Sequence, residues 1–168
     1  MANNRVFKPD TKVKVISNAN GVIDWKSNLT GRHIKFLKAG TPKTIDFAEL
    51  EDMVWSGNAL ITDGIIYVPD KEAFYATGIQ NVEWESIKPI TEIKNMLLTL
   101  EAEELREQVS KLSPATKELL AEETLNEFDN LKGSVINVVE DVTKTNISQM
   151  KEDEKANLEH QKKTKEKG

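Results

Sequence analysis

Cysteine is absent from the 168 residues of this chain, and histidine occurs only at His33 and His160. Disulfide bonds and thiolate metal sites are therefore excluded, and we expect no metal site and no cofactor. Long apolar runs are also missing, since no stretch approaches the roughly 20 apolar residues that span a membrane. The first ten residues lack the apolar segment of a signal peptide. We expect a soluble protein that is made in the cytoplasm.

Sequence signatures of catalysis are missing as well. The chain contains no GxSxG nucleophile motif and neither of the glycine-rich phosphate-binding patterns, GxxxxGK[ST] and GxGxxG. The carboxylates between Glu101 and Glu107 have helical spacing, so we interpret them as a solvated helix face. Glu49, Glu51 and Asp52 fit the first turns of a helix, where the macrodipole favours acids. We therefore predict no catalytic residues and a protein that is not an enzyme.

Charge is distributed unevenly, although the whole chain carries a net charge of -5. Residues 1–48 hold nine Lys or Arg against three Asp, net +6, whereas residues 49–89 have a net charge of -6. Any contact with a polyanion is therefore expected near the N-terminus. The candidate nucleic-acid-binding residues are the basic side chains predicted to face outward there, namely Lys12, Lys14, Arg32, Lys35 and Lys38. The alternative is that these charges protect exposed strand edges.

Short segments with strand periodicity dominate residues 11–68. Apolar and polar residues alternate over 11–16 and 32–38, and Val22 to Trp25 follows a turn signal, so we predict a hairpin of 11–16 with 22–25. A second hairpin is predicted from Ala59 to Val68 around the dipeptide Asp63-Gly64. Between them, IDFAELEDM indicates a short helix capped by Asp46. The residues expected to be buried are Val13, Val15, Ile34, Phe36, Phe47, Leu50, Ile61 and Ile66.

The second half of the chain has helical patterns. Lys88-Pro89 is a predicted domain boundary, and a helix from Thr91 carries apolar residues at helical spacing, with a continuation to Leu112 left open. Ser113-Pro114 predicts the start of the next helix, with serine as cap and proline in the first turn. Residues 133–142 are rich in β-branched side chains, so helix and strand both remain open, and the neighbouring helices favour helix.

Few apolar residues follow Ile147. Met150 and Leu158 are nearly the only large ones, so this tail is predicted to be disordered or to be a helix that partners hold in place. We name Trp55, Met150 and Leu158 as candidate partner-interface residues. The predicted organisation is an N-terminal arm (1–10), a β-rich domain (11–88), a helical region (89–146) and a charged tail (147–168). The predicted fold class is α+β, with a small antiparallel β-barrel or sandwich and an inserted short helix before an α-helical C-terminal region.

Three stretches carry a resemblance to a known group of proteins. The turn Asn18-Ala19-Asn20-Gly21, the segment IDFAELEDM and the segment GNALITDGIIYV together resemble small virion-associated proteins of tailed bacteriophages, and SPATKELLAEETL at 113–125 adds to the likeness. The resemblance centres on residues 11–79. It implies a non-enzymatic structural protein of the virion, as a head-associated (capsid), decoration or connector-region subunit.

The same resemblance implies many copies in the particle and other phage structural proteins as partners. It carries no functional residue across to this chain. A different class remains open beside it: a nucleic-acid-binding or host-directed regulatory phage protein that uses a basic face of the N-terminal barrel. Nucleic acid is therefore kept as an alternative partner, and no membrane contact is expected.

Overall fold

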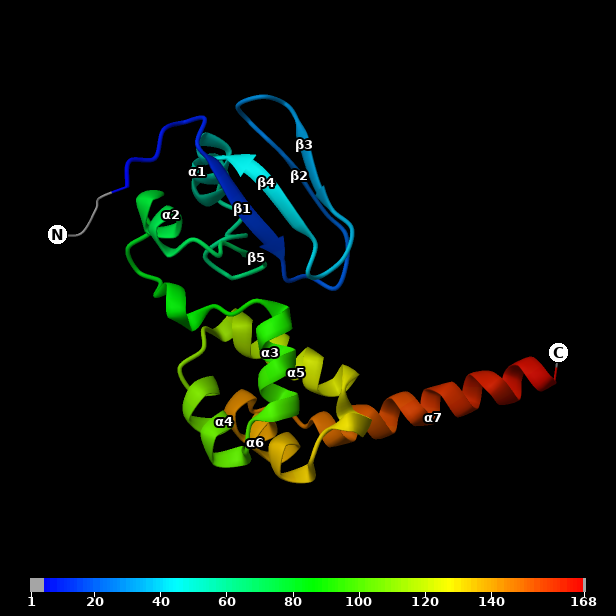
Figure 1. Cartoon of the computed structure of the whole chain (residues 1–168). Helices are drawn as coiled ribbons and strands as arrows, with labels where there is room; N and C mark the ends of the chain where they lie inside the picture. Colours follow the sequence, from blue (N-terminus) through cyan, green and yellow to red (C-terminus); the bar gives the residue numbers. More distant parts are fainter. Residues whose placement is uncertain (1–4, 168) are drawn as a thin grey trace. The chain divides into compact units, whose positions relative to one another are not determined.

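The predicted α+β class is found in the computed structural model, which describes residues 5–167. The chain divides into two units. Unit 1 runs to Glu92 and also takes in Leu112–Thr116, and unit 2 holds Ile93–Lys111 and the chain from Lys117 onward. All strands among the described residues belong to unit 1, and unit 2 is helical (Figure 1).

Unit 1 contains two small antiparallel sheets. Strand β1 (Lys12–Ser17) is the middle of a three-stranded sheet, between β4 (Pro42–Asp46) and β5 (Ile66–Tyr67). Strands β2 (Ile23–Lys26) and β3 (His33–Phe36) form a separate two-stranded sheet. The prediction was a small antiparallel barrel or sandwich. The sheets do not close into one hydrogen-bonded barrel, so the barrel form of that prediction is wrong.

Helix α1 (Phe47–Trp55) completes the core of unit 1. It begins after Asp46, as predicted, and it ends before Gly57, whose positive φ of 86° suits a residue without a side chain. Its first backbone N–H groups donate to the carbonyl oxygens of Pro9 and Thr11, at 3.0 and 2.8 Å. These bonds satisfy donors that a helix start leaves unpaired.

The core of unit 1 confirms the predicted buried positions. All eight residues are buried: Val13, Val15, Ile34, Phe36, Phe47, Leu50, Ile61 and Ile66. They form one cluster together with Trp25, Ile45 and Met53. Side chains from both sheets and from α1 therefore share one apolar interior, and the alternation of the strands was a reliable guide to it.

The predicted hairpin of 11–16 with 22–25 is wrong. Strand β1 pairs instead with β4, from Lys12 opposite Asp46 to Ile16 opposite Pro42. Strand β2 pairs with β3, which places Trp25 opposite Ile34. After β1 the chain leaves the ladder at Asn18, whose side-chain amide donates to the distant carbonyl oxygens of Gly64 and Lys88, at 2.9 and 3.1 Å.

The predicted hairpin from Ala59 to Val68 is also wrong. Residues 59–64 fold into turns, in which the Asp63 N–H donates to the Ala59 carbonyl at 2.9 Å. Only Ile66 and Tyr67 form a strand, and they pair with the end of β1. Gly64 still has the positive φ, 74°, that the dipeptide Asp63-Gly64 predicts, so the turn signal was correct and the strand pairing was not.

Among the described residues, unit 2 is built from five helices, of which α3 and α5 begin in unit 1. The predicted helix from Thr91 does not continue to Leu112, because Glu101 has an extended backbone and begins a new helix. The predicted start at Ser113-Pro114 is confirmed, and the Ser113 hydroxyl accepts the Thr116 N–H at 3.2 Å. Residues 133–142 are helical. The helices are α3 (Ile90–Thr99), α4 (Ala102–Val109), α5 (Pro114–Asn126), α6 (Gly133–Thr143) and α7 (Ile147–Glu166).

Helix α2 and two 3-10 turns lie between the longer elements. Helix α2 (Lys71–Ala76) is capped by the Asp70 carboxylate, which accepts the N–H groups of Glu72 and Ala73. The same carboxylate binds the Arg5 guanidinium at 2.5 Å. Phe7 packs on Phe47 with ring centroids 5.1 Å apart, so Phe7 joins the N-terminal segment to α1. Single 3-10 turns lie at Trp84–Ser86 and Phe128–Asn130.

Candidate functional site

The five basic residues named as nucleic-acid-binding candidates lie on separate parts of unit 1. Lys12 and Lys14 project outward from β1 of the three-stranded sheet, and Lys35 projects from β3 of the two-stranded sheet. Arg32 precedes β3, and Lys38 lies between β3 and β4. All five are exposed. The structure therefore distributes them over two sheets and two connections.

Two of these charges are neutralised by the chain itself. The Lys12 ammonium pairs with Asp46, its neighbour across the ladder. The Arg32 guanidinium pairs with Glu49 of α1 at 3.4 Å. Within residues 5–167, the ammonium groups of Lys14, Lys35 and Lys38 have no recorded hydrogen bond or ion pair. Only these three of the five are available to an external anion.

The outer face of the two-stranded sheet carries both signs of charge. Asp24 of β2 lies opposite Lys35 in the ladder, and its Oδ1 atom lies 2.8 Å from His33 Nδ1, within hydrogen-bond distance. Lys26 lies opposite His33. A carboxylate in the middle of this face lowers its positive potential.

Glu49 is a buried carboxylate that the sequence did not single out. Its helix position suggested a first-turn acid, yet its side chain is only 4% exposed. Oε1 accepts from Arg32 and from the Asp46 N–H at 3.4 Å, while Oε2 has no hydrogen-bond partner. The Arg32–Glu49 ion pair links the segment before β3 to α1. Asp52 of α1 makes a second link to this segment by accepting the Asn28 N–H at 3.0 Å. The signal that could have found Glu49 is its place three residues after the cap Asp46, the spacing of a capping box, which Glu51 and Asp52 do not share.

Trp55 is the largest exposed aromatic side chain described in unit 1. Its side chain lies at the end of α1 and the residue is 67% exposed. The indole Nε1–H donates to the Thr77 carbonyl at 2.8 Å, and a Cβ at Gly78 would come within 3.2 Å of the ring. The ring is thus held in one orientation on the surface. Fixed, exposed aromatic rings are typical anchors in protein interfaces.

Tyr67 is a buried ionisable group in the same unit. Its ring stacks with Trp84 at a centroid distance of 6.1 Å. Burial raises the pKa of Tyr67 to about 12, and the negative charge of Glu92 adds to this shift. The phenol therefore stays protonated at neutral pH and supplies no base.

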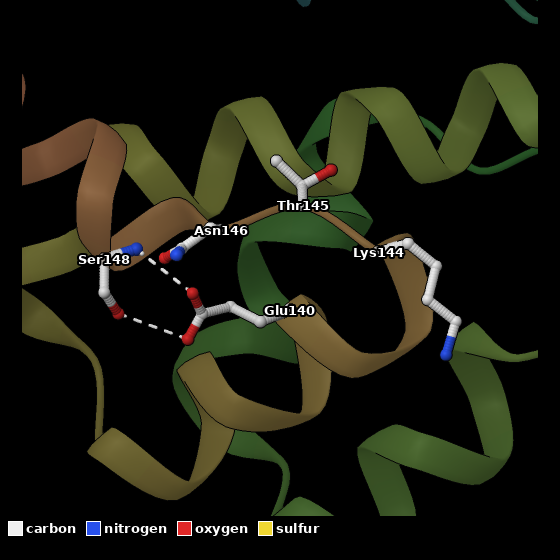
Figure 2. A pocket seen from close by; sticks show the side chains of 5 residues that line it. All are labelled: Glu140, Lys144, Thr145, Asn146 and Ser148. Atoms are coloured by element: carbon white, nitrogen blue, oxygen red, sulfur yellow. Dashed lines mark hydrogen bonds between the residues drawn. The ribbon is translucent and has the colours of Figure 1, made fainter.

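A shallow polar pocket lies where α6 turns into α7. Figure 2 shows the five side chains that line it: Glu140, Lys144, Thr145, Asn146 and Ser148. The Glu140 carboxylate accepts both the N–H and the hydroxyl of Ser148 at 3.2 Å, and Asn146 caps α7 by accepting the Gln149 N–H. These bonds explain the cluster as the start of α7.

Helix α7 presents the two remaining predicted interface residues. It has 20 residues, and Ile147 is the one buried residue assigned to it. Met150 is 44% exposed and Leu158 is 57% exposed. Both predicted side chains are therefore accessible on one long helix.

Residues 5–167 contain neither a metal-ligand cluster nor a membrane-spanning helix. In the described part of the chain, no group of three or more His, Cys, Asp or Glu is placed to hold a metal ion. No helix between residues 5 and 167 is both long and apolar enough to span a membrane. Comparison of the chain with protein families, with curated proteins and with solved structures gave no match.

Proposed function

We propose that this chain is a non-enzymatic structural protein of a tailed-phage particle, acting through protein contacts as a head-associated, decoration or connector-region subunit. The observation that carries the proposal is α7. A helix of 20 residues that buries only Ile147 gains little from packing on its own unit. Because tertiary packing of an apolar face stabilises most protein helices, a partner at this face would supply the missing packing.

Trp55 supports the same proposal from unit 1. Its ring is fixed by the Thr77 carbonyl and is largely exposed, so little conformational entropy is lost when a partner covers it. Assembly through α7 and Trp55 gives the subunit two separate contact surfaces. Two surfaces per subunit are what an extended multi-copy assembly requires.

Removal of α7 tests the proposal. Mass spectrometry of purified phage particles should detect the full chain, whereas a chain truncated after Asn146 should be missing from them. Fluorescence of Trp25, Trp55 and Trp84 checks the fold of unit 1, since all three lie there. If the full chain is absent from particles, the proposal fails.

Point variants sharpen this test. Met150→Ser combined with Leu158→Ser removes the two exposed apolar side chains of α7 and should reduce incorporation strongly. The matched control is Gln149→Ser with Asn157→Ser, which changes exposed polar residues of the same helix and should be incorporated normally. Equal incorporation of both double variants would contradict a role of the apolar pair.

The second candidate function is binding of nucleic acid by unit 1. It is favoured by the accessible ammonium groups of Lys14, Lys35 and Lys38. Phosphate contacts of this kind lose affinity steeply with salt, and each Lys→Ala change should weaken binding without changing sequence preference. The absence of binding at low salt would leave these lysines as edge-protecting charges.

A further inference from the structure

The two exposed large apolar residues of α7, Met150 and Leu158, lie toward the side of the helix that also carries Ile147. Ile147, Glu154, Leu158 and Lys165 follow one another at spacings that return to the same side of a helix with 3.6 residues per turn, and Met150 lies beside them. Ile147 is buried in unit 2, and the Lys151 side chain is only 19% exposed. Every described residue after Lys151 is exposed, so the helix extends beyond the other helices of unit 2 (Figure 1).

Few contacts stabilise this extension. Between described residues of α7, side chains pair at Lys151 with Glu154, 3.8 Å apart, and at Gln149 with Asp153, 3.0 Å apart. Lys155 also reaches Asp129 at 4.0 Å. Each exposed pair of this type contributes only a few tenths of a kcal/mol. The side with Leu158 therefore remains open to a second helix.

The charges of α7 are unevenly distributed along its length. Three consecutive acids, Glu152, Asp153 and Glu154, lie in the first half between Lys151 and Lys155, and the second half carries Lys162, Lys163 and Lys165 together with Glu159 and Glu166. This order follows the helix macrodipole, which favours acids near the N-terminus and bases near the C-terminus. It also makes the helix complementary to a copy of itself that runs in the opposite direction.

We propose that α7 pairs with α7 of a second copy of this chain in an antiparallel arrangement. Leu158 lies against Leu158 of the second copy at the twofold axis, and Glu154 lies opposite Lys162 of the second copy. A parallel pair would instead place acids beside acids and lysines beside lysines. The inference rests on the proposed function, because it names the partner that covers the apolar side of α7.

Cysteine cross-linking tests the arrangement directly, because the full chain contains no cysteine of its own. Leu158→Cys should form a disulfide-linked dimer, which non-reducing electrophoresis detects. Met150→Cys is the control, since it is similarly exposed but lies about 24 Å from its symmetry mate in the antiparallel pair, too far for a disulfide.

Charge exchange provides an independent readout. Glu154→Lys should raise the dissociation constant of the dimer about tenfold in sedimentation at low salt, because two attractive pairs become repulsive. Adding Lys162→Glu should restore association. Glu152→Lys, which changes the net charge equally on another side of the helix, should have a much smaller effect.

The outcomes separate this inference from the proposed function. Equal cross-linking at positions 150 and 158 would overturn the antiparallel arrangement, and a monomeric Leu158→Cys chain would overturn self-association. If that chain is monomeric while the Met150→Ser, Leu158→Ser variant is lost from particles, α7 binds a different subunit. In that case the inference fails and the proposed function stands.

Discussion

Leu50 is a residue whose contribution to stability can be predicted directly. It lies on the inner side of α1 and is 0% exposed. Leu50→Ala removes buried methyl groups and leaves a cavity, so the free energy of unfolding of unit 1 should fall by about 2–5 kcal/mol. Urea unfolding followed by tryptophan fluorescence measures this change. The control is Leu37→Ala, because Leu37 is 66% exposed and its loss should change stability by less than about 0.5 kcal/mol.

Asn18 has a structural role that differs from the turn role its sequence suggests. Its Nδ2 group donates to the carbonyl oxygens of Gly64 and Lys88, at 2.9 and 3.1 Å, and its Oδ1 atom accepts the Ile90 N–H at 3.0 Å. Asn18→Ala leaves these groups without their partner, at a cost of about 1–3 kcal/mol for each group that stays buried. Urea unfolding followed by tryptophan fluorescence measures this loss of stability, and Asn81→Ala, at an exposed position, is the control. An unchanged midpoint would contradict this role.

At the scale of elements, an ion pair joins α4 to α6. The Arg106 guanidinium binds Asp141, and this hydrogen bond together with the positive charge lowers the pKa of Asp141 below its ordinary value of 3.8, with Lys144 adding to the shift. A carboxyl group with a lowered pKa stabilises the folded state above its unfolded pKa. The contribution is lost as the pH falls through the folded pKa.

Arg106→Gln should therefore raise the pKa of Asp141 toward its ordinary value. An NMR titration of the Asp141 carboxyl carbon measures the change. The effect on stability should be small, because both side chains are exposed and solvent screens the pair. Lys111→Gln removes an exposed charge elsewhere in unit 2 and should leave the titration of Asp141 unchanged. An unshifted pKa in the Arg106 variant would mean that the pair does not persist in solution.

At the scale of the whole molecule, α7 is expected to be the least protected helix of the free chain. Amides after Ser148 should exchange quickly in dilute solution, since Ile147 is the residue that anchors the helix. They should exchange slowly in the assembled state. Amides of α6 around the buried Val138 and Val139 provide the internal control and should be slow in both. Slow exchange of α7 at concentrations where the chain is monomeric would contradict the prediction.

The candidate contact residues differ in how well the sequence predicted their surroundings. Exposure of Met150 and Leu158 followed from the polar composition around them, and the same reasoning predicted a helix or a disordered tail. The basic candidates were chosen by strand alternation, which places a side chain inward or outward but does not say what lies beside it. Pairing of Lys12 with Asp46 and of Arg32 with Glu49 joins residues far apart in the chain, so it could not be derived from that pattern.

The sequence by itself determined the local elements. Asp46 and Ser113-Pro114 mark helix starts through backbone donors that these side chains satisfy or that proline lacks, and alternation assigned the buried side of β1 and β3. Such signals act between residues within a few positions of each other. They are present in the unfolded chain and need no tertiary contact to be read.

Only the tertiary structure decided which strands pair. The local pattern made a hairpin of β1 with β2 plausible, yet β1 pairs with β4 and β5 and leaves β2 to β3. In the observed pairing Trp25 lies opposite Ile34, and Asn18 bonds to groups near Gly64 and Ile90. Strand pairing depends on the free energy of the whole core, because every alternative register moves apolar side chains between interior and solvent. That free energy is a sum over residues distant in sequence, which no local motif contains.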